Sequence, residues 1–382
     1  MIIMSKPINK GYNKKILHHK QELRDALKGK PIYPITIEIF TSDTCNQNCV
    51  YCMADKYRNE HNKKMNKELL KKIIKDMAGK TKAINFTGGG EPYVNKEITD
   101  SGIVLAKQNG LEVGIITNAE LMDDTSINIV VDNCSWVRIS LDAITPKIYN
   151  TVRYKKISDS DHHIKKVLEN IKKLVAKRKQ KKQNRLEKIG VQVVLVNENI
   201  NDLKNVFETM STIGIDYLQI RPPELRPYAN ETQYSPEFLK RTKTAIEEVL
   251  QKHSNLKNNT SLEITARPDK FKAIDQANFQ KKYNVCYGSN FTAVITTDGK
   301  VYHCCYWVGI PKFEIGDLSK QSYEEVFMGQ KRKNIRNSIN ISKCQPICKN
   351  HATNLLIHEN KDKGIDYMIQ NFRQPSIFIN FL

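Results

Sequence analysis

Cys45-Asn46-Gln47-Asn48-Cys49-Val50-Tyr51-Cys52 places three cysteines on one short segment, directly after the apolar stretch Ile35 to Phe40. A disulfide framework does not fit this run, because three neighbouring thiols leave one without a partner. Soft thiolates suit zinc and iron–sulfur clusters. Zinc needs a fourth ligand, either His61 or a distant cysteine, whereas a cluster held by three cysteines keeps one iron open for another molecule. The run therefore predicts a metal centre on a loop that follows the first strand.

Strand-like and helix-like segments alternate from residue 34 to residue 221. The expected strands are short, apolar and rich in Ile and Val, as in parallel sheets buried on both faces. They cover Ile35–Phe40, Ala83–Thr87, Glu112–Thr117, Trp136–Leu141, Val191–Val196 and Tyr217–Arg221. The expected helices cover Lys67–Met77, Lys96–Gln108, Asp124–Val131, His163–Lys182 and Asp202–Ile213. Six βα repeats with right-handed crossovers predict an α/β fold, a partial (β/α)6 barrel with its working groups at the carboxyl ends of the strands.

The amino-acid composition limits the classes of protein to which this chain can belong. No stretch of about eighteen apolar residues is present, so no membrane span is expected, and the first twenty residues lack the apolar core of a signal peptide. Nine cysteines in a cytoplasmic chain favour metal binding over disulfides. The net charge of +20 fits a polyanionic partner or a lysine-rich solvated surface. We favour the surface interpretation, because the lysines are spread along the whole chain.

Four more cysteines lie in the last third of the chain: Cys286, Cys304, Cys344 and Cys348. Between the first two, Ala293 to Tyr302 is typical of two strands joined by an Asp-Gly turn, so the hairpin should bring these thiols together. The last two have C-x₃-C spacing. Four converging thiolates fit either a structural zinc or a fully ligated cluster. Cys305 is a spare thiol, and the sequence does not decide between Cys304 and Cys305 as the ligand.

The cysteine run resembles the signature of the radical S-adenosylmethionine (SAM) superfamily, C-x₃-C-x-(aromatic)-C, with Tyr51 at the aromatic position. Thr87-Gly88-Gly89-Gly90-Glu91-Pro92 follows the second strand, where that family has its glycine motif. Asp298 to Cys304 and Ile315 to Leu318 resemble the twitch or SPASM-type extension of many radical SAM enzymes. Full SPASM extensions hold seven cysteines and two clusters. Only five cysteines stand in this region, which favours one auxiliary cluster.

The resemblance implies two 4Fe–4S clusters. Cys45, Cys49 and Cys52 would hold the cluster that binds SAM, and Cys286, Cys304, Cys344 and Cys348 would hold the auxiliary cluster. One-electron cleavage of SAM would yield methionine and a 5′-deoxyadenosyl radical, which abstracts a hydrogen atom from the substrate. No other residue is assigned a catalytic role.

The resemblance also implies how SAM is held. Backbone carbonyls of Gly88, Gly89 and Gly90 would accept from its amino group, because no side chain blocks their approach. Glu91 would add charge or brace the turn. Arg153 stands where the family places a carboxylate-binding arginine.

The ribose hydroxyls would meet Asn118 and Ser140, and adenine would lie against Tyr51 and the backbone near Val194 to Val196. The alternative for each polar residue is a strand-end side chain that caps the next helix.

We interpret the chain as a radical SAM oxidoreductase that acts on a small-molecule substrate, such as a sugar or aminocyclitol alcohol, with the auxiliary cluster as an electron acceptor. A one-electron donor such as flavodoxin or ferredoxin is then expected. Enzymes that modify ribosomal peptides or RNA are alternatives. Only some thirty-three residues precede the first strand, which disfavours the peptide alternative. A zinc-binding nucleic-acid protein is the alternative from another class.

The expected organisation has four parts. Residues 1–33 form a basic N-terminal segment, 34–260 the barrel core, 261–350 the auxiliary cluster domain and 351–382 a C-terminal tail.

Overall fold

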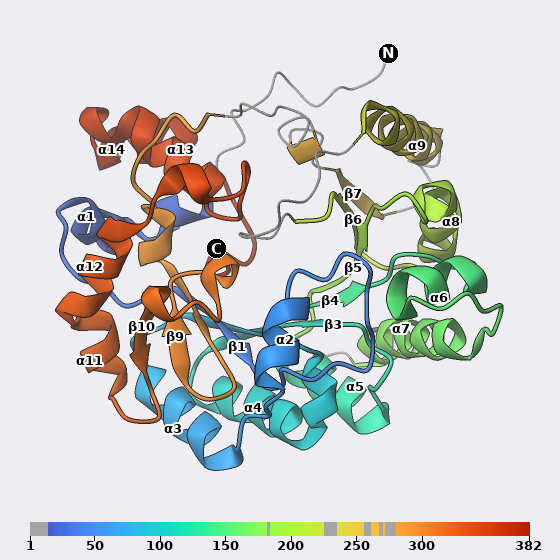
Figure 1. Cartoon of the computed structure of the whole chain (residues 1–382), viewed down its shortest axis with the longest axis horizontal. Helices are drawn as coiled ribbons and strands as arrows, with labels where there is room; N and C mark the ends of the chain where they lie inside the picture. Colours follow the sequence, from blue (N-terminus) through green and yellow to red (C-terminus); the bar gives the residue numbers. More distant parts are fainter. Residues whose placement is uncertain (1–13, 182–183, 225–234, 256–260, 267–269, 272–279) are drawn as a thin grey trace.

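Ten strands form one continuous sheet in the order β10-β9-β8-β1-β2-β3-β4-β5-β6-β7 within the described part of the chain (Figure 1). Their bounds are β1 (Thr36–Phe40), β2 (Ala83–Thr87), β3 (Glu112–Thr117), β4 (Trp136–Ser140), β5 (Lys188–Val194), β6 (Tyr217–Arg221), β7 (Glu263–Ala266), β8 (Thr292–Ile295), β9 (Lys300–Tyr302) and β10 (Glu314–Asp317). This computed structural model describes residues 14–181, 184–224, 235–255, 261–266, 270–271 and 280–382. The first thirteen residues of the predicted N-terminal segment and the predicted helix end at Lys182 lie outside those ranges.

The strands β1 to β7 are all parallel to their neighbours. β1 does not pair with β7 in the described residues, so the sheet stays open. Helices on its outer side join successive strands, as Figure 1 shows. They are α3 (Lys67–Met77), α4 (Lys96–Gln108), α5 (Asp124–Asn133), α7 (His162–Gln180), α8 (Leu203–Ile213) and α9 (Pro236–Asn255). The predicted α/β fold with an open parallel barrel is therefore confirmed.

Two short helices, α2 (Asp55–His61) and α6 (Pro146–Tyr154), follow β1 and β4. The N-terminal residues form a 3₁₀ turn, η1 (Lys14–His18), and α1 (Lys20–Leu27). The last third of the chain contributes α11 (Tyr323–Met328), α12 (Gln330–Ser338), α13 (His351–Asn360) and α14 (Ile365–Phe372). Among the described helices, none is long and apolar enough to cross a bilayer.

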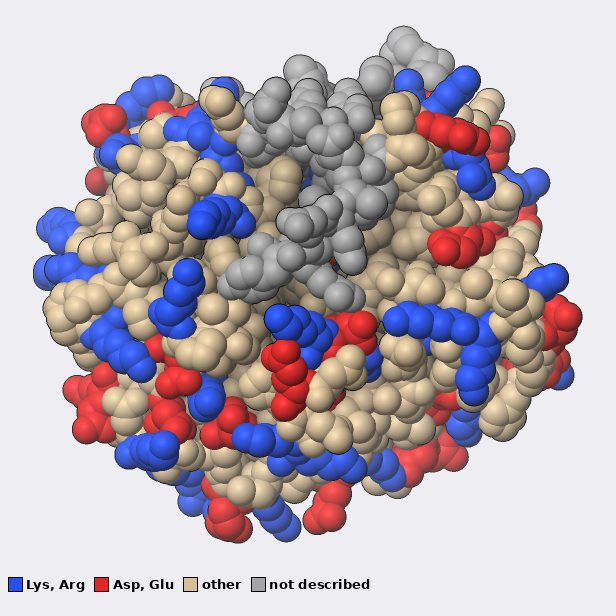
Figure 2. All heavy atoms as spheres, in the orientation of Figure 1, with Lys and Arg blue, Asp and Glu red and all other residues tan. Residues whose placement is uncertain are grey.

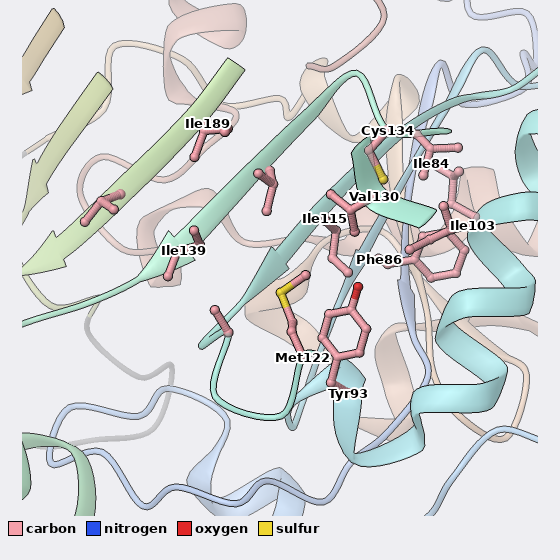
Figure 3. Close-up of a cluster of buried hydrophobic side chains, with 14 of the residues drawn as sticks. Ile84, Phe86, Tyr93, Ile103, Ile115, Met122, Val130, Cys134, Ile139 and Ile189 are labelled. Carbon is pink, nitrogen blue, oxygen red and sulfur yellow. The ribbon is translucent and has the colours of Figure 1, made fainter. Parts of the chain in front are cut away.

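The main core lies between the sheet and its outer helices. Figure 3 shows Ile84 and Phe86 of β2 and Ile115 of β3 packed against Ile103 of α4 and Val130 of α5. All five side chains are fully buried. Burial of this kind stabilises the fold by roughly 1.5–3 kcal/mol per side chain. Cys134 also lies in this core, as expected for a cysteine with no metal role.

The C-terminal strands extend the barrel sheet. β8 pairs with β1 in parallel, and β8 and β9 form an antiparallel hairpin in which Gly299 has a φ of +87°. The predicted Asp-Gly hairpin is therefore confirmed. β7 lies beyond the boundary expected at residue 260 and pairs with β6.

The tail after α14 covers the amino ends of the barrel strands. The hydroxyl of Thr36, the first residue of β1, donates to Asn380 O at 2.5 Å. The side-chain amide of Asn380 donates to Oε1 of Glu112, the first residue of β3, at 2.7 Å. Phe381 packs edge-to-face on Trp136 of β4 with ring centroids 5.4 Å apart. The neighbouring Phe378 has a φ of +53°, which is strained for a residue with a Cβ. The tail therefore forms a floor under the barrel.

We expect Phe381→Ala to lower the free energy of unfolding by roughly 3 kcal/mol, because a buried ring would leave a cavity beside Trp136. Ile377→Ala in the same tail is the control, since Ile377 is 52% exposed and should change stability by less than about 0.5 kcal/mol. Denaturant unfolding measures both, and amide hydrogen exchange reports whether the tail detaches. Equal effects of the two changes would contradict this packing.

Candidate functional site

The three cysteines of the first run are half-buried on the loop between β1 and α2. The backbone N–H of Gln47 donates to Cys45 Sγ at 3.4 Å, and Arg153 Nη1 donates to Cys49 Sγ at 3.5 Å. Burial, and then the charge of Glu91, raises the pKa of Cys45 to about 12. Thiolates at this loop would therefore need a positive partner, as metal ligation provides.

The glycine run packs against the segment that leads into the first cysteine. The N–H of Gly90 donates to Ser42 O at 3.0 Å, and the N–H of Glu91 donates to Thr44 O at 2.9 Å. A Cβ on Gly90 would lie 2.0 Å from Thr44 O, and one on Gly89 would lie 2.7 Å from the Tyr57 ring. These glycines are required for close approach of two backbone segments. The predicted contact of their carbonyls with the amino group of SAM stays a prediction.

Glu91 braces the turn, which was one of its two predicted roles. Its carboxylate accepts from the Thr117 hydroxyl at 2.5 Å, the Asn118 N–H at 2.8 Å and the Tyr93 N–H at 3.1 Å. Burial raises the pKa of Glu91 to about 7, and the three donors oppose that shift. The carboxylate thus joins the carboxyl ends of β2 and β3.

Arg153 of α6 lies in a buried ion pair. Its Nε is 2.7 Å from Asp142 Oδ2, and the two side chains are 4% and 0% exposed. Tyr51 donates to the same Asp142 oxygen at 2.5 Å. Tyr51 and Arg153, two of the residues predicted to contact SAM, therefore share one carboxylate. Arg153 Nη2 is buried without a hydrogen-bond partner. That amino group is the one left to receive an anionic ligand.

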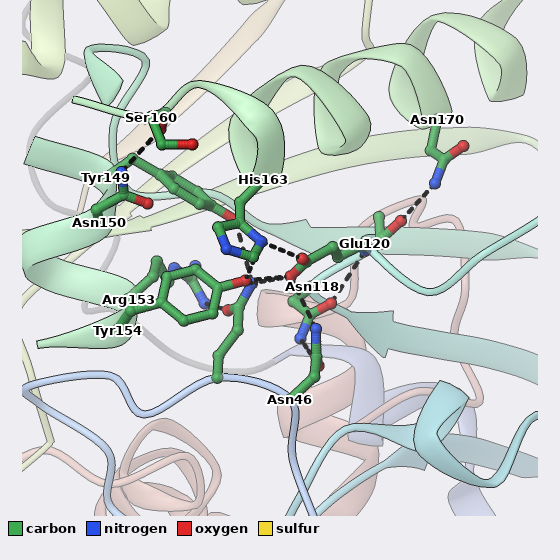
Figure 4. Close-up of polar contacts among 12 residues, drawn as sticks. Asn46, Asn118, Glu120, Tyr149, Asn150, Arg153, Tyr154, Ser160, His163 and Asn170 are labelled. Atoms are coloured by element: carbon green, nitrogen blue, oxygen red, sulfur yellow. Dashed lines mark hydrogen bonds and ion pairs between the residues drawn. The ribbon is translucent and has the colours of Figure 1, made fainter. Parts of the chain in front are cut away.

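A network centred on Glu120 clamps the cysteine loop (Figure 4). Its carboxylate accepts from Asn46 at 2.7 Å and Gln47 at 3.0 Å, which both lie between the first two cysteines. Tyr154 of α6 donates to one oxygen, and His163 Nδ1 of α7 lies 2.6 Å from the other. Sequence reasoning missed this network, because its members are polar residues on four separate elements without a shared motif.

The two predicted ribose contacts lie at strand ends. Asn118 follows β3 and is bound within the network, since its Nδ2 donates to Asn46 Oδ1 at 2.9 Å and its Oδ1 accepts from the Glu120 N–H. Ser140 is the last residue of β4, opposite Gln192 of β5, and is partly exposed. Asn118 therefore positions the loop, whereas Ser140 is partly exposed at the carboxyl end of the sheet.

The auxiliary cysteines come from three separate segments. Cys286 precedes β8, Cys304 follows β9, and Cys344 and Cys348 follow α12. Cys286, Cys304 and Cys344 pack against one apolar cluster with Tyr283 and Trp307. Burial, followed by the charges of Cys348 and Cys286, raises the pKa of Cys344 to about 12. The four thiols therefore lie within electrostatic reach of one another.

The spare thiol points elsewhere. Cys305 packs with Phe40, Tyr57 and Val294, in a different apolar cluster from Cys304. Burial and the charge of Glu38 raise its pKa to about 12. This placement favours Cys304 over Cys305 as the ligand.

A cavity of about 840 Å³ occupies the open barrel. Its rim includes Met53 and Ala54, which follow the first cysteine run, and Gly88 of the glycine run. Cys304, Cys305 and Cys348 line the same cavity from the auxiliary side. Trp136, Phe378 and Phe381 line its amino end. The cavity therefore connects the two cysteine sites.

Within the described residues, no three or more His, Cys, Asp or Glu side chains are arranged around a point for a single metal ion. The first loop nevertheless fits a larger group. It offers three thiols, two N–H donors aimed at their sulfurs and the unpartnered Nη2 of Arg153. N–H donors to sulfur are a usual feature around iron–sulfur ligands.

Known curated proteins share part of this sequence. GTP 3′,8-cyclase of Clostridium botulinum (strain Okra / Type B1) is 29% identical over 230 residues, 58% of this chain and 64% of that protein. The tungsten-containing aldehyde ferredoxin oxidoreductase cofactor-modifying protein of Pyrococcus furiosus is 28% identical over 179 residues, 46% of this chain and 48% of that protein. The chain thus spans less than two thirds of the length of either of these two relatives.

Solved structures share the fold. Streptococcus suis SuiB bound to S-adenosylmethionine has a TM-score of 0.62 at 14% identity, over 88% of this chain and 76% of that one. Native anSMEcpe with bound AdoMet has a TM-score of 0.59 at 16% identity, over 89% of this chain and 100% of that one.

Two family models match this chain directly. The model of the radical SAM superfamily matches residues 39–210, which include the cysteine run, the glycine run and the Glu120 network. The SPASM model, an iron–sulfur cluster-binding domain, matches residues 286–350, which include the four auxiliary cysteines. These matches confirm the resemblance seen in the sequence: the chain belongs to the radical SAM superfamily and carries a C-terminal SPASM-type domain.

Proposed function

We propose that this chain is a radical SAM oxidoreductase that removes a hydrogen atom from a small-molecule substrate held between its two cysteine sites. The shared cavity carries this proposal, because residues next to the first cysteine run and thiols of the auxiliary set line the same space. Its volume of about 840 Å³ is typical of small-molecule sites. The matches to the radical SAM and SPASM models argue against the alternative of a zinc-binding nucleic-acid protein.

The radical SAM domain implies a 4Fe–4S cluster and SAM, and the SPASM domain implies auxiliary iron–sulfur chemistry. When bound, these groups supply a strong hydrogen-atom acceptor and a one-electron acceptor. Cys45, Cys49 and Cys52 would hold the first cluster, and Cys286, Cys304, Cys344 and Cys348 would hold one auxiliary cluster.

The chain's own residues bind and orient SAM in this proposal. Arg153, whose Nη2 has no hydrogen-bond partner, would bind its carboxylate, and the carbonyls of the glycine run would accept from its amino group. Ser140 would meet its ribose, and Tyr51, held by Asp142, would lie beside the adenine. The tail closes the amino end of the cavity, opposite the cysteine loop.

A polyhydroxylated small molecule, such as a sugar or aminocyclitol, is the substrate class that we propose. The curated relatives support a small molecule, since their printed name is GTP 3′,8-cyclase. Removal of a hydrogen atom from a carbinol carbon, followed by loss of one electron and one proton, gives a carbonyl, a net two-electron oxidation. A ribosomal peptide is the second candidate, because S. suis SuiB was solved with its precursor peptide, although that likeness is one of fold alone.

We further propose a cytoplasmic setting with a one-electron donor such as flavodoxin or ferredoxin, because an open iron–sulfur cluster needs a reducing compartment. Figure 2 shows Lys and Arg spread over the visible face and mixed with Asp and Glu. That distribution favours a solvated surface over a continuous nucleic-acid patch on this face.

The first prediction concerns the cysteine run. Oxygen-free protein with reconstituted clusters should hold about eight irons per chain and form 5′-deoxyadenosine from SAM after reduction. Replacing Cys45, Cys49 and Cys52 together by alanine should halve the iron and abolish 5′-deoxyadenosine. Iron and sulfide analysis with chromatography of the products measures both. Zinc in place of iron, with no cleavage of SAM, would refute the proposed function.

The second prediction separates the two adjacent thiols of the auxiliary domain. Cys304→Ala should reduce the iron content to about four per chain, because a 4Fe–4S cluster lacks its fourth ligand. Cys305→Ala is the matched control and should keep about eight, because its side chain packs with Phe40 and Tyr57. The reverse result would assign the ligand to Cys305.

The third prediction tests the clamp on the cysteine loop. Glu120→Ala removes the acceptor of two loop side chains and should speed the loss of iron from the first site on exposure to a chelator by about tenfold. Asp124→Ala nearby is the control, since that carboxylate is exposed and pairs only with Lys173 in the described structure. Chelation kinetics followed by absorbance measure both. Equal rates would show that the clamp does not hold the loop.

A further inference from the structure

The acidic residues that line the barrel cavity are all neutralised by cations of the same lining. Glu38 pairs with Lys349 at 2.9 Å, Glu263 with Lys188 at 3.5 Å and Glu60 with Lys56 at 3.9 Å. The fourth, Glu224, pairs with Arg221. Glu38 and Glu224 are the least exposed of the four, and a shielded carboxylate paired in this way has little charge left for a ligand.

Arg138 is a lining cation without such a partner. It lies in the middle of β4, and no carboxylate of the described residues forms an ion pair with it. Its Nη1 donates to Gln219 Oε1 at 3.4 Å, and its Nε is buried with no hydrogen-bond partner. Its guanidinium carbon lies 5.8 Å from the centroid of the Trp136 ring. Burial lowers the pKa of Arg138. Tyr217 opposes that shift, Arg221 adds to it, and the charges of Glu38 and Glu224 also oppose it.

A buried, permanently charged guanidinium with an unsatisfied donor is costly to keep. Structural packing does not explain it, because an uncharged side chain of similar length would fill the same place more favourably. The cost is offset when a ligand brings an oxyanion, since guanidinium groups bind carboxylates and phosphates through paired charge-assisted hydrogen bonds. A guanidinium that lines the cavity without an ion-pair partner therefore points to a ligand.

A second unsatisfied atom belongs to a residue in the wall of the same cavity. Asn85 of β2 lines it, and its Oδ1 is buried without a hydrogen-bond partner. This oxygen can accept from a hydroxyl or amino group of a ligand. An unmatched donor and an unmatched acceptor in one lumen fit a molecule with both an oxyanion and hydroxyl groups.

The position of Arg138 along β4 determines how deep in the barrel a bound ligand would lie. Arg138 precedes Ser140, at the carboxyl end of β4, by two residues, or about 7 Å along a strand. Trp136, two residues in the other direction, packs against Phe381 in the floor. A ligand anchored at Arg138 would extend from the middle of the barrel toward the cysteine loop.

We propose that Arg138 binds an oxyanion group of the substrate, a carboxylate or a phosphate, and holds the substrate upright in the barrel with its reacting carbon toward the carboxyl ends of the strands. This inference rests on the proposed function, and it narrows the substrate to anionic small molecules.

Titration calorimetry on oxygen-free protein with both clusters and SAM tests the proposal. The probes are inorganic phosphate, pyrophosphate and succinate. We expect the unmodified chain to bind at least one of them, and Arg138→Gln to bind it at least about tenfold more weakly, because a charge-assisted hydrogen bond is lost. Arg138→Lys should recover part of the affinity, since it restores the positive charge but not the paired N–H donors of the guanidinium. Arg24→Gln, on the exposed side of α1, is the control for general charge and should bind as the unmodified chain does.

Iron content and substrate-free formation of 5′-deoxyadenosine should stay unchanged in Arg138→Gln. They separate a failure of this inference from a failure of the proposed function, and they show that the variant is folded. Binding of phosphate or pyrophosphate alone would identify a phosphoester, and binding of succinate alone a carboxylate. Equal affinity in Arg138→Gln and the unmodified chain, or no binding of any probe at about 10 mM, would overturn the proposal.

Discussion

The buried ion pair between Arg153 and Asp142 is the interaction on which the candidate SAM site depends. Its side chains are 4% and 0% exposed, so removal of either partner would leave a buried charge without compensation, at a cost of roughly 3–5 kcal/mol. The pair joins α6 to the loop after β4. Through Tyr51, Gln47 and Cys49 it also joins both to the cysteine loop. Long-range polar contacts therefore position this loop before any metal binds. That arrangement suits a site whose open position must accept a second molecule, because the ligands do not have to be ordered by the metal alone.

One strand, β1, sets the relation between the two cysteine sites. Its carboxyl end leads into the first cysteine run, and its free side pairs with β8. The hairpin of β8 and β9 then delivers Cys304 directly. Glu38 in the middle of β1 binds Lys349, which follows Cys348, at 2.9 Å. Backbone pairing and one ion pair thus hold the thiols of both sites against the same strand. In the proposed function, a substrate between the two sites would lie close to both without any domain movement.

The strands and the first site were predictable from local pattern, and the rest depends on tertiary contacts. β2, β3 and β6 have the predicted bounds, because apolar β-branched runs mark buried parallel strands. α6 was not predicted, since its nine residues begin with a proline and lack a long apolar stripe. Arg153 was predicted from its motif alone, but the carboxylate that binds it was not. The Glu120 clamp could not be predicted either, because its members contact one another only after four elements have packed. Cys304 and Cys305 pack in different apolar clusters, a difference that two adjacent identical residues cannot reveal in the sequence.

The partial barrel leaves its amino end open, and the tail closes it. Edge-to-face packing of Phe381 on Trp136 and the hydrogen bonds of Asn380 give the cavity an apolar floor. An apolar floor lowers the local dielectric constant, which strengthens every charge–charge interaction in the cavity and makes an unpaired cation more costly. The acids of the lining are neutralised, whereas the Nε of Arg138 is not satisfied. If Arg138 binds the substrate as proposed, closure by the tail would increase the preference of the barrel for an anionic ligand, because a neutral molecule would leave the guanidinium without an anionic partner. The same floor shields the end of the barrel opposite the cysteine loop, so one packing contact shapes the cavity in which the ligand would bind.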